Sequence, residues 1–89
     1  MVYLITYDLN KPGKDYTSLY LALRQYQFIR DTGLDSVWFV STQLAPGQIY
    51  EHLRHHLDIS DRIFITQIQG GTHQGWMNAD VWAWINARI

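Results

Sequence analysis

Residues 2–10 read VYLITYDLN, and this stretch decides the fold. It is rich in β-branched and aromatic residues and is apolar almost without interruption, which is typical of a strand buried on both faces. We therefore expect residues 2–9 to form a central strand of a sheet. The strand ends near Asp8, which then lies at the mouth of a loop that leads into a helix.

The residues after this strand predict a loop and then a first helix. Residues 10–14 contain a Pro-Gly pair, which interrupts regular structure because proline has no N–H to donate and glycine permits unusual backbone angles. Asp15 is the expected N-cap. From Tyr16 onward, apolar positions recur every three or four residues, as one face of an amphipathic helix requires. These positions are Leu19, Tyr20, Leu23 and either Tyr26 or Gln27.

Three further strands and a second helix follow. Residues 27–32 and 35–42 predict two strands, and the short connection at Gly33 and Leu34 makes them antiparallel. A second helix begins at Ala45 with Pro46 in its first turn, and it is closed by residues 58–61. Residues 62–69 predict the fourth strand. The apolar stripe of the second helix consists of Ile49, Leu53 and Leu57.

The C-terminal segment completes the arrangement. After a loose linker, residues 76–89 predict a tail helix with Val81, Trp82, Ile85 and Ile89 on one face. The order β-α-β-β-α-β matches the ferredoxin-like α+β fold, a four-stranded antiparallel sheet with two helices on one face, here with an added C-terminal helix. The 89 residues fit a single domain, 1–89.

Composition limits the classes of function. The net charge of −1 argues against a protein that coats long stretches of nucleic acid, because such binding needs clustered Lys and Arg. Without cysteine, the chain has no disulfide, thiolate metal ligand or thiol nucleophile. No segment approaches the roughly 18 apolar residues of a membrane span, and the N-terminus lacks signal-peptide features. We expect a soluble, cytoplasmic protein that does not bind membranes.

Two interpretations of Asp8 stay open. As a structural residue, its carboxylate accepts backbone N–H bonds and fixes the loop. As a functional residue, it is half of a metal site: one carboxylate binds Mg²⁺ weakly, but an isologous dimer that brings two Asp8 side chains together makes a site that neither subunit has alone. The metal would be Mg²⁺ or Mn²⁺.

Several other side chains are candidate ligands. Asn10, Lys11 and Lys14 flank the same loop and would hold a phosphate beside Asp8, although lysines in surface loops are usually just solvated. His52 and His56 share a helical face and could chelate a metal ion, but the HExxH motif is absent and histidines in a last turn also suit the helix dipole. The four tryptophans can stack on bases, whereas packing is their ordinary role.

The strand ending in Tyr7-Asp8, the ferredoxin-like order and the strand at residues 36–39 resemble the Cas-two-like superfamily, which includes the second CRISPR-associated protein and the VapD toxins. This resemblance covers residues 1 to about 69. Residues 7–16, Gly75-Trp76 and residues 82–85 are most similar to the small bacterial and phage proteins of the SinR family, over nearly the whole chain.

The resemblance implies a homodimer. For the nuclease members it also implies metal-dependent cleavage of RNA or DNA phosphodiesters, with the strand-ending aspartate, here Asp8, binding the ion. The chain differs from the CRISPR members in its near-neutral charge, its loop at residues 10–15 and its tryptophan-rich tail. Two hypotheses follow: a homodimeric metal-dependent endoribonuclease, and a non-catalytic dimeric module that binds a protein or a nucleotide and in which the Asp8 loop is structural.

Overall fold

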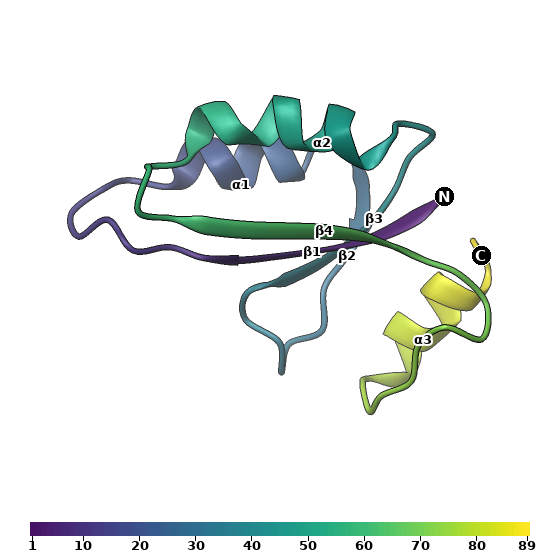
Figure 1. Ribbon diagram of the computed structural model, residues 1–89. Coiled ribbons are helices and arrows are strands. Elements are labelled where there is room, and N and C mark those ends of the chain that lie inside the picture. The colour runs from purple at the N-terminus through teal and green to yellow at the C-terminus, as the bar shows by residue number, and fades with distance from the viewer.

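The computed structural model describes residues 1–89, which form four strands and three α-helices (Figure 1). In chain order these elements are β1 (Val2–Asp8), α1 (Thr17–Leu23), β2 (Gln27–Ile29), β3 (Val37–Ser41), α2 (Pro46–Leu53), β4 (Arg62–Ile68) and α3 (Ala79–Asn86). A short 3₁₀ helix, η1 (Arg54–His56), extends α2. The predicted β-α-β-β-α-β order with a C-terminal helix is confirmed.

β1 lies inside the sheet, as its apolar sequence predicts. The strand order is β2-β3-β1-β4, and each neighbouring pair is antiparallel. The register sets Ile5 of β1 opposite Trp38 on one side and opposite Ile65 on the other. This topology is the ferredoxin-like α+β arrangement, with α1 and α2 on the same side of the sheet (Figure 1).

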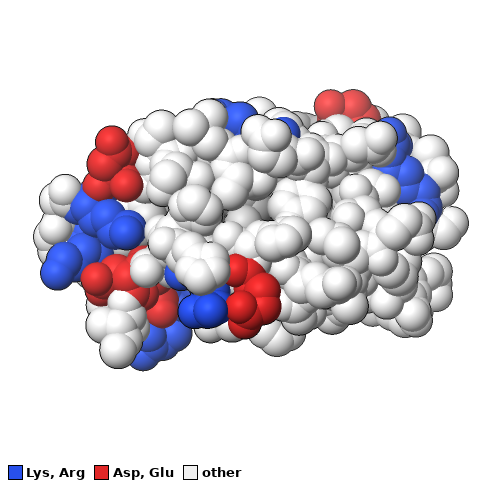
Figure 2. All heavy atoms as spheres, turned by 90° about the horizontal axis from the view of Figure 1, so that it is seen from above, with Lys and Arg blue, Asp and Glu red and all other residues white.

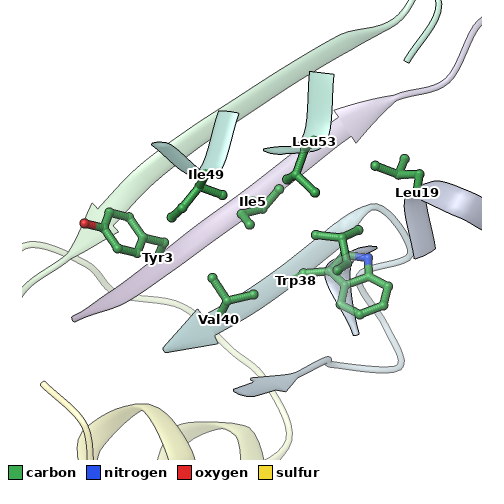
Figure 3. Close-up of a cluster of buried hydrophobic side chains, with 8 residues drawn as sticks. Tyr3, Ile5, Leu19, Trp38, Val40, Ile49 and Leu53 are labelled. Carbon is green, nitrogen blue, oxygen red and sulfur yellow. The ribbon is translucent and has the colours of Figure 1, made fainter. Parts of the chain in front are cut away.

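The larger core lies between the sheet and the helix pair α1 and α2 (Figure 3). Because side chains alternate along a strand, every second residue of β1 points into this layer. The polar atoms of its large aromatic residues have partners: Tyr3 Oη donates to Leu44 O at 2.8 Å, and Trp38 Nε1 donates to Tyr7 Oη at 3.0 Å. The buried members are Tyr3, Ile5, Leu19, Leu23, Trp38, Val40, Ile49 and Leu53.

The opposite face of the sheet is covered only in part. There α3 packs its buried Val81 and Ile85 against Val2, Phe39 and Ile68. Figure 1 shows α3 on the side of the sheet away from α1 and α2, near the chain termini. The half of this face that lies towards the end of β1 carries no helix. β1 is therefore buried on both faces near Val2 and becomes exposed towards its end.

That uncovered half bears two cross-strand pairs. Thr6 stands opposite Phe64, and Asp8 stands opposite Arg62. Paired residues of an antiparallel sheet point to the same side, so all four side chains belong to one surface, here called the Asp8 surface. Phe64 is 62% exposed, whereas Ile63 and Ile65 pack against the core on the other face.

The start of α2 agrees with the sequence prediction, whereas the start of α1 differs from it. Ala45 is the N-cap of α2, Pro46 follows it, and Gln48 Oε1 accepts the Ala45 N–H at 2.8 Å. The prediction that Asp15 caps α1 is wrong, because Tyr16 occupies the N-cap position. Asp15 lies one residue earlier and accepts the Thr17 N–H at 2.9 Å, so it still satisfies a free donor of the first turn.

Several elements are shorter than their sequence patterns predict, among them β3, which spans Val37–Ser41 instead of residues 35–42. α1 ends at Leu23, β2 stops at Ile29, and the tail helix begins at Ala79 instead of residue 76. The last two differences share a cause: the buried carboxylate of Asp31 accepts the Gly33 N–H at 2.8 Å and the Asn78 N–H at 2.7 Å. The first bond turns the chain after β2. The second fixes the residue that precedes α3. None of the helices has the length and apolar character that crossing a membrane requires.

We predict that Leu53→Ala lowers the free energy of unfolding by about 2 to 5 kcal/mol, because it leaves a cavity in the core between α2 and the sheet. Leu21→Ala is the matched control, since Leu53 is 0% and Leu21 is 52% exposed and both are helical leucines. Its expected cost is below about 1 kcal/mol. Chemical denaturation measures both, and equal losses would contradict the described core.

Candidate functional site

Asp8 is the last residue of β1, and its side chain is exposed. It lines a shallow hollow of about 240 Å³ together with Thr6, Tyr7, Arg62, Ile63 and Phe64. The Asp8 carboxylate accepts no hydrogen bond and forms no ion pair; only the Asp8 backbone carbonyl is engaged, by Asn10. Its oxygens are thus free to bind a ligand.

Asp61 provides the loop-fixing contacts that sequence analysis considered for Asp8. Its side chain is 7% exposed. Oδ1 accepts the Asn10 N–H at 2.7 Å and the Tyr16 hydroxyl at 2.7 Å, and Oδ2 accepts the Asp58 N–H at 2.7 Å. One carboxylate therefore joins the loop after β1 to the loop before β4. Asn10 and Asp61, which this contact connects, are 51 positions apart in the sequence.

Asn10 is tied into the same junction by its side chain. Nδ2 donates to Ser60 O at 3.0 Å and to Asp8 O at 3.3 Å. An amide nitrogen has two hydrogens, so both donors of Asn10 are occupied by backbone carbonyls. Its visible task is to hold the end of β1 in place, and a phosphate would have to displace one of these bonds.

The acidic groups of this junction are stabilised in their charged forms. Burial raises the pKa of Asp61, but the hydrogen bonds from Tyr16, Asn10 and Asp58 together with the charge of Lys14 outweigh it, so the pKa lies below its ordinary value. The hydroxyl and N–H of Ser60 lower the pKa of Asp58, and Lys11 acts in the same direction. Both residues are carboxylates at neutral pH.

The two lysines belong to the electrostatic surroundings of Asp58 and Asp61. Lys11 acts on Asp58, and Lys14 acts on Asp61 and lies 5.5 Å from the centre of the Tyr16 ring. Figure 2 shows charges of both signs mixed at the end of the molecule where these loops lie, with few charged side chains over the middle of the helical face. The surroundings of Asp8 thus combine cations with carboxylates.

Arg62 is a cation that sequence analysis did not single out. The register places it directly across from Asp8, and both line the same hollow. Its Nη1 donates to Asp61 O at 2.9 Å and to Ile59 O at 3.4 Å, while Nη2 and Nε have no partner in the chain. The pairing of β1 with β4 brings Arg62 next to Asp8. The only sign of this in the sequence was that Arg62 is the first residue of the predicted fourth strand.

One chain offers too few donors for a metal ion. No group of three or more His, Asp or Glu side chains is positioned to hold one. On α2 and η1, the three histidines do not form such a group, and His52 Nδ1 lies 3.1 Å from the Tyr26 hydroxyl. Asp8 presents free carboxylate oxygens that suit Mg²⁺ or Mn²⁺, so the remaining ligands must come from water, substrate or a second copy.

We predict that Asp61→Asn destabilises the protein by about 1 to 3 kcal/mol at pH 7, because it removes the charge that accepts these buried hydrogen bonds. Asp35→Asn is the control: Asp35 is exposed and its side chain accepts no hydrogen bond, so the expected change is within about 0.5 kcal/mol. Denaturation at pH 7 measures both variants.

Asp61→Asn also tests the direction in which the pKa of Asp61 is shifted. The folded pKa of Asp61 is below that of the unfolded chain, near 3.9, so its contribution is present above this pH and is lost as the pH falls towards the folded value. Stability of the wild type should therefore decline more steeply below about pH 4 than stability of Asp61→Asn. If the stabilities of the wild type and of Asp61→Asn change in parallel with pH, Asp61 does not stabilise the protein in this way.

A comparison with protein-family models and with curated protein sequences gave no match. Membership of the Cas-two-like superfamily therefore stays a prediction from the sequence.

Proposed function

We propose that two copies of the chain form a dimer through the Asp8 surface, bind Mg²⁺ or Mn²⁺ between their Asp8 carboxylates, and cleave RNA. The observation that carries this proposal is the unpartnered, exposed Asp8 carboxylate on an uncovered half of the sheet. Asp61 makes the loop-fixing bonds, so Asp8 is not needed for them.

A two-fold contact between Asp8 surfaces suits this role. The contact would bury Phe64, a large apolar side chain that is 62% exposed in the single chain. In an isologous interface residues beside the two-fold axis meet their own copies, so the proposal places this axis beside Asp8. α3 covers the other half of the face and limits the contact to the half that carries Asp8.

Pairing through the free edge of β4 would not make this site. β4 has seven residues and lies at the end of the sheet. Two β4 strands paired antiparallel about their centre would set their first residues roughly 20 Å apart. Because Asp8 lies beside Arg62 at that end, the two Asp8 carboxylates would be separated by a similar distance. The proposal therefore requires packing by sheet faces.

The residues around Asp8 have separate tasks in the proposed reaction. The Asp8 oxygens would hold the metal ion, which would supply Lewis-acid chemistry for phosphodiester hydrolysis. Hydrolysis adds the water oxygen to phosphorus, breaks the bond to a ribose oxygen and leaves a proton on that oxygen. Arg62 uses its free Nη2 and Nε to orient the scissile phosphate. Lys11 and Lys14 hold the next phosphate along the RNA strand. Asn10 keeps the loop after β1 in place.

The second candidate function is a non-catalytic dimeric module that binds a nucleotide or a protein. The observation that favours it is a larger cavity beside α3, described below, that is separate from the Asp8 hollow. In this case the Asp8 loop is structural and Asp8 has no catalytic role.

For the nuclease, we predict that the purified protein cleaves labelled single-stranded RNA with Mg²⁺ or Mn²⁺ and that EDTA abolishes the reaction. Asp8→Asn should reduce the rate by at least about a hundredfold, since it removes the charge that binds the ion. Arg62→Ala should lose roughly tenfold or more. The control is Asp35→Asn, which alters an exposed aspartate outside this hollow.

The dimer must be measured on the same samples. If Asp8→Asn remains dimeric and retains full activity, the catalytic assignment is wrong. If no cleavage occurs with either metal while the protein still binds RNA, the non-catalytic module is the better description.

For the interface, we predict that Phe64→Glu converts the dimer to monomers, because a charge buried between two apolar surfaces has no partner. Leu21→Glu is the matched control, since Leu21 is an exposed apolar residue of α1, on the other side of the sheet. Light scattering at micromolar concentration distinguishes the two states. A dimer that withstands Phe64→Glu, or a wild-type monomer, would place the subunit contact elsewhere or remove it.

A further inference from the structure

A cavity of about 530 Å³ lies between α3, the sheet and the segment that connects β4 to α3. Its volume falls in the range of small-molecule sites. Phe39 and Ile85 contribute apolar surface, and Leu4 and Thr66, opposite each other in the strand register, contribute from the sheet face. The site is thus built where α3 meets the sheet face that α1 and α2 leave free (Figure 1).

Aromatic rings dominate one side of this cavity. The rings of His73 and Trp82 are nearly parallel, with an interplanar angle of 14° and centroids 6.0 Å apart. Trp76 also lines the cavity and is 98% exposed. An indole so exposed gains almost nothing from burial within this chain, so core packing does not explain it. A flat ligand that enters the cavity would find aromatic faces to stack on.

Polar atoms without partners accompany these rings. His73 Nδ1 lies 2.9 Å from Gln69 O, and since a carbonyl only accepts, Nδ1 carries the hydrogen. In the neutral ring Nε2 is then a free acceptor. Gln74 uses its Oε1 to accept the Gly75 N–H, which leaves its amide hydrogens free, and the Trp82 indole N–H has no partner in the chain. The residues that line the cavity therefore include both donors and an acceptor without partners in the chain.

The cavity contains no Lys, Arg, Asp or Glu among its lining residues. An anionic headgroup or a free phosphate would find no cation there, and a cationic ligand would find no carboxylate. The ligand that fits is neutral, planar and able to form hydrogen bonds at its edge. These are the properties of a nucleobase.

The cavity is held in shape by hydrogen bonds of the segments that surround it. Asp31 fixes the N–H of Asn78 at the start of α3, and Thr72 Oγ1 donates to Gln69 O at 2.8 Å. Gly71 takes the turn after β4 with φ of 80°, a backbone conformation that suits glycine. A pre-formed site loses less conformational entropy on binding.

We propose that this cavity, here called the α3 cavity, binds a nucleobase between Trp82 and Trp76. The inference rests on the proposed function in one respect: it names the base as part of the RNA substrate. Leu4 lines the cavity and Asp8 follows it by four residues on the same sheet face, roughly 13 Å along β1. A short single strand spans that distance, so a base held in the α3 cavity directs the neighbouring backbone towards Asp8.

The test is binding in EDTA, where no metal-dependent cleavage occurs. We expect each of two probes, free nucleosides by calorimetry and a fluorescein-labelled single-stranded RNA by anisotropy, to bind saturably if the base alone is recognised. Binding of RNA alone would show that the base is captured only as part of a strand. In both cases Trp82→Ala and Trp76→Ala should weaken binding at least about fivefold, the loss expected for one stacked base.

The controls separate binding from folding and from catalysis. Trp84→Ala makes the same change on α3, but Trp84 does not line the cavity and instead packs under Arg88, whose guanidinium lies 4.1 Å from the ring centre. It should bind normally. Trp76 is so exposed that its removal leaves the fold intact, which covers the case in which Trp82→Ala unfolds. Asp35→Asn, which alters an exposed aspartate outside both the cavity and the Asp8 hollow, should bind RNA as the wild type does.

The inference would be overturned if neither probe binds, or if both probes bind the Trp76 and Trp82 variants as well as they bind the wild type. Preference for an aromatic peptide over nucleosides and RNA would also overturn it and would identify the cavity as a protein-docking site. Metal-dependent cleavage with no loss of binding in the tryptophan variants leaves the proposed nuclease intact while removing this site. Binding of a base in the α3 cavity without cleavage of RNA would leave this site intact while removing the proposed nuclease.

Discussion

The carboxylate of Asp61 is the contact on which the end of the sheet depends. It joins Asn10, Tyr16 and the N–H of Asp58, three groups that belong to both loops at this end of the molecule. Because it is buried and fully engaged, it holds the last residue of β1 in position against the first residue of β4. Asp8 is thereby placed without using its own side chain, which keeps a free carboxylate at a defined location.

The arrangement of strands and helices could be predicted because it is encoded locally. Alternating and continuous apolar runs indicated the strands, and spacing of three and four indicated the helices, so the position of β1 and the start of α2 followed from neighbouring residues. The Asp61 junction could not be predicted in the same way. Its bond to Asn10 spans 51 positions, and an aspartate in a turn looks the same whether it fixes its own loop or another. The prediction for the start of α3 was wrong for a related reason, since the distant bond from Asn78 N–H to Asp31 fixes the residue that precedes this helix.

The face of the sheet opposite α1 and α2 has two parts with different chemistry, one covered by α3 and one uncovered. Near Val2, the helix and the connecting segment enclose an aromatic, uncharged cavity. Towards Asp8, the face is open and carries a carboxylate, a guanidinium and an exposed phenyl ring. β1 runs beneath both parts, and the alternation of its side chains presents Leu4 to one and Asp8 to the other. A single strand thus fixes their separation.

This division bears on how a chain of net charge −1 could hold a nucleic acid. Affinity that comes from neutralised phosphates grows with the number of cations in contact and falls steeply with salt. Here Lys11 and Lys14 share their field with Asp58 and Asp61, so the phosphate-binding contribution is small. Stacking on tryptophan does not require net positive charge and tolerates any base. If the two halves of the sheet face act together, the aromatic cavity supplies affinity, while the few charges near Asp8 orient one phosphate.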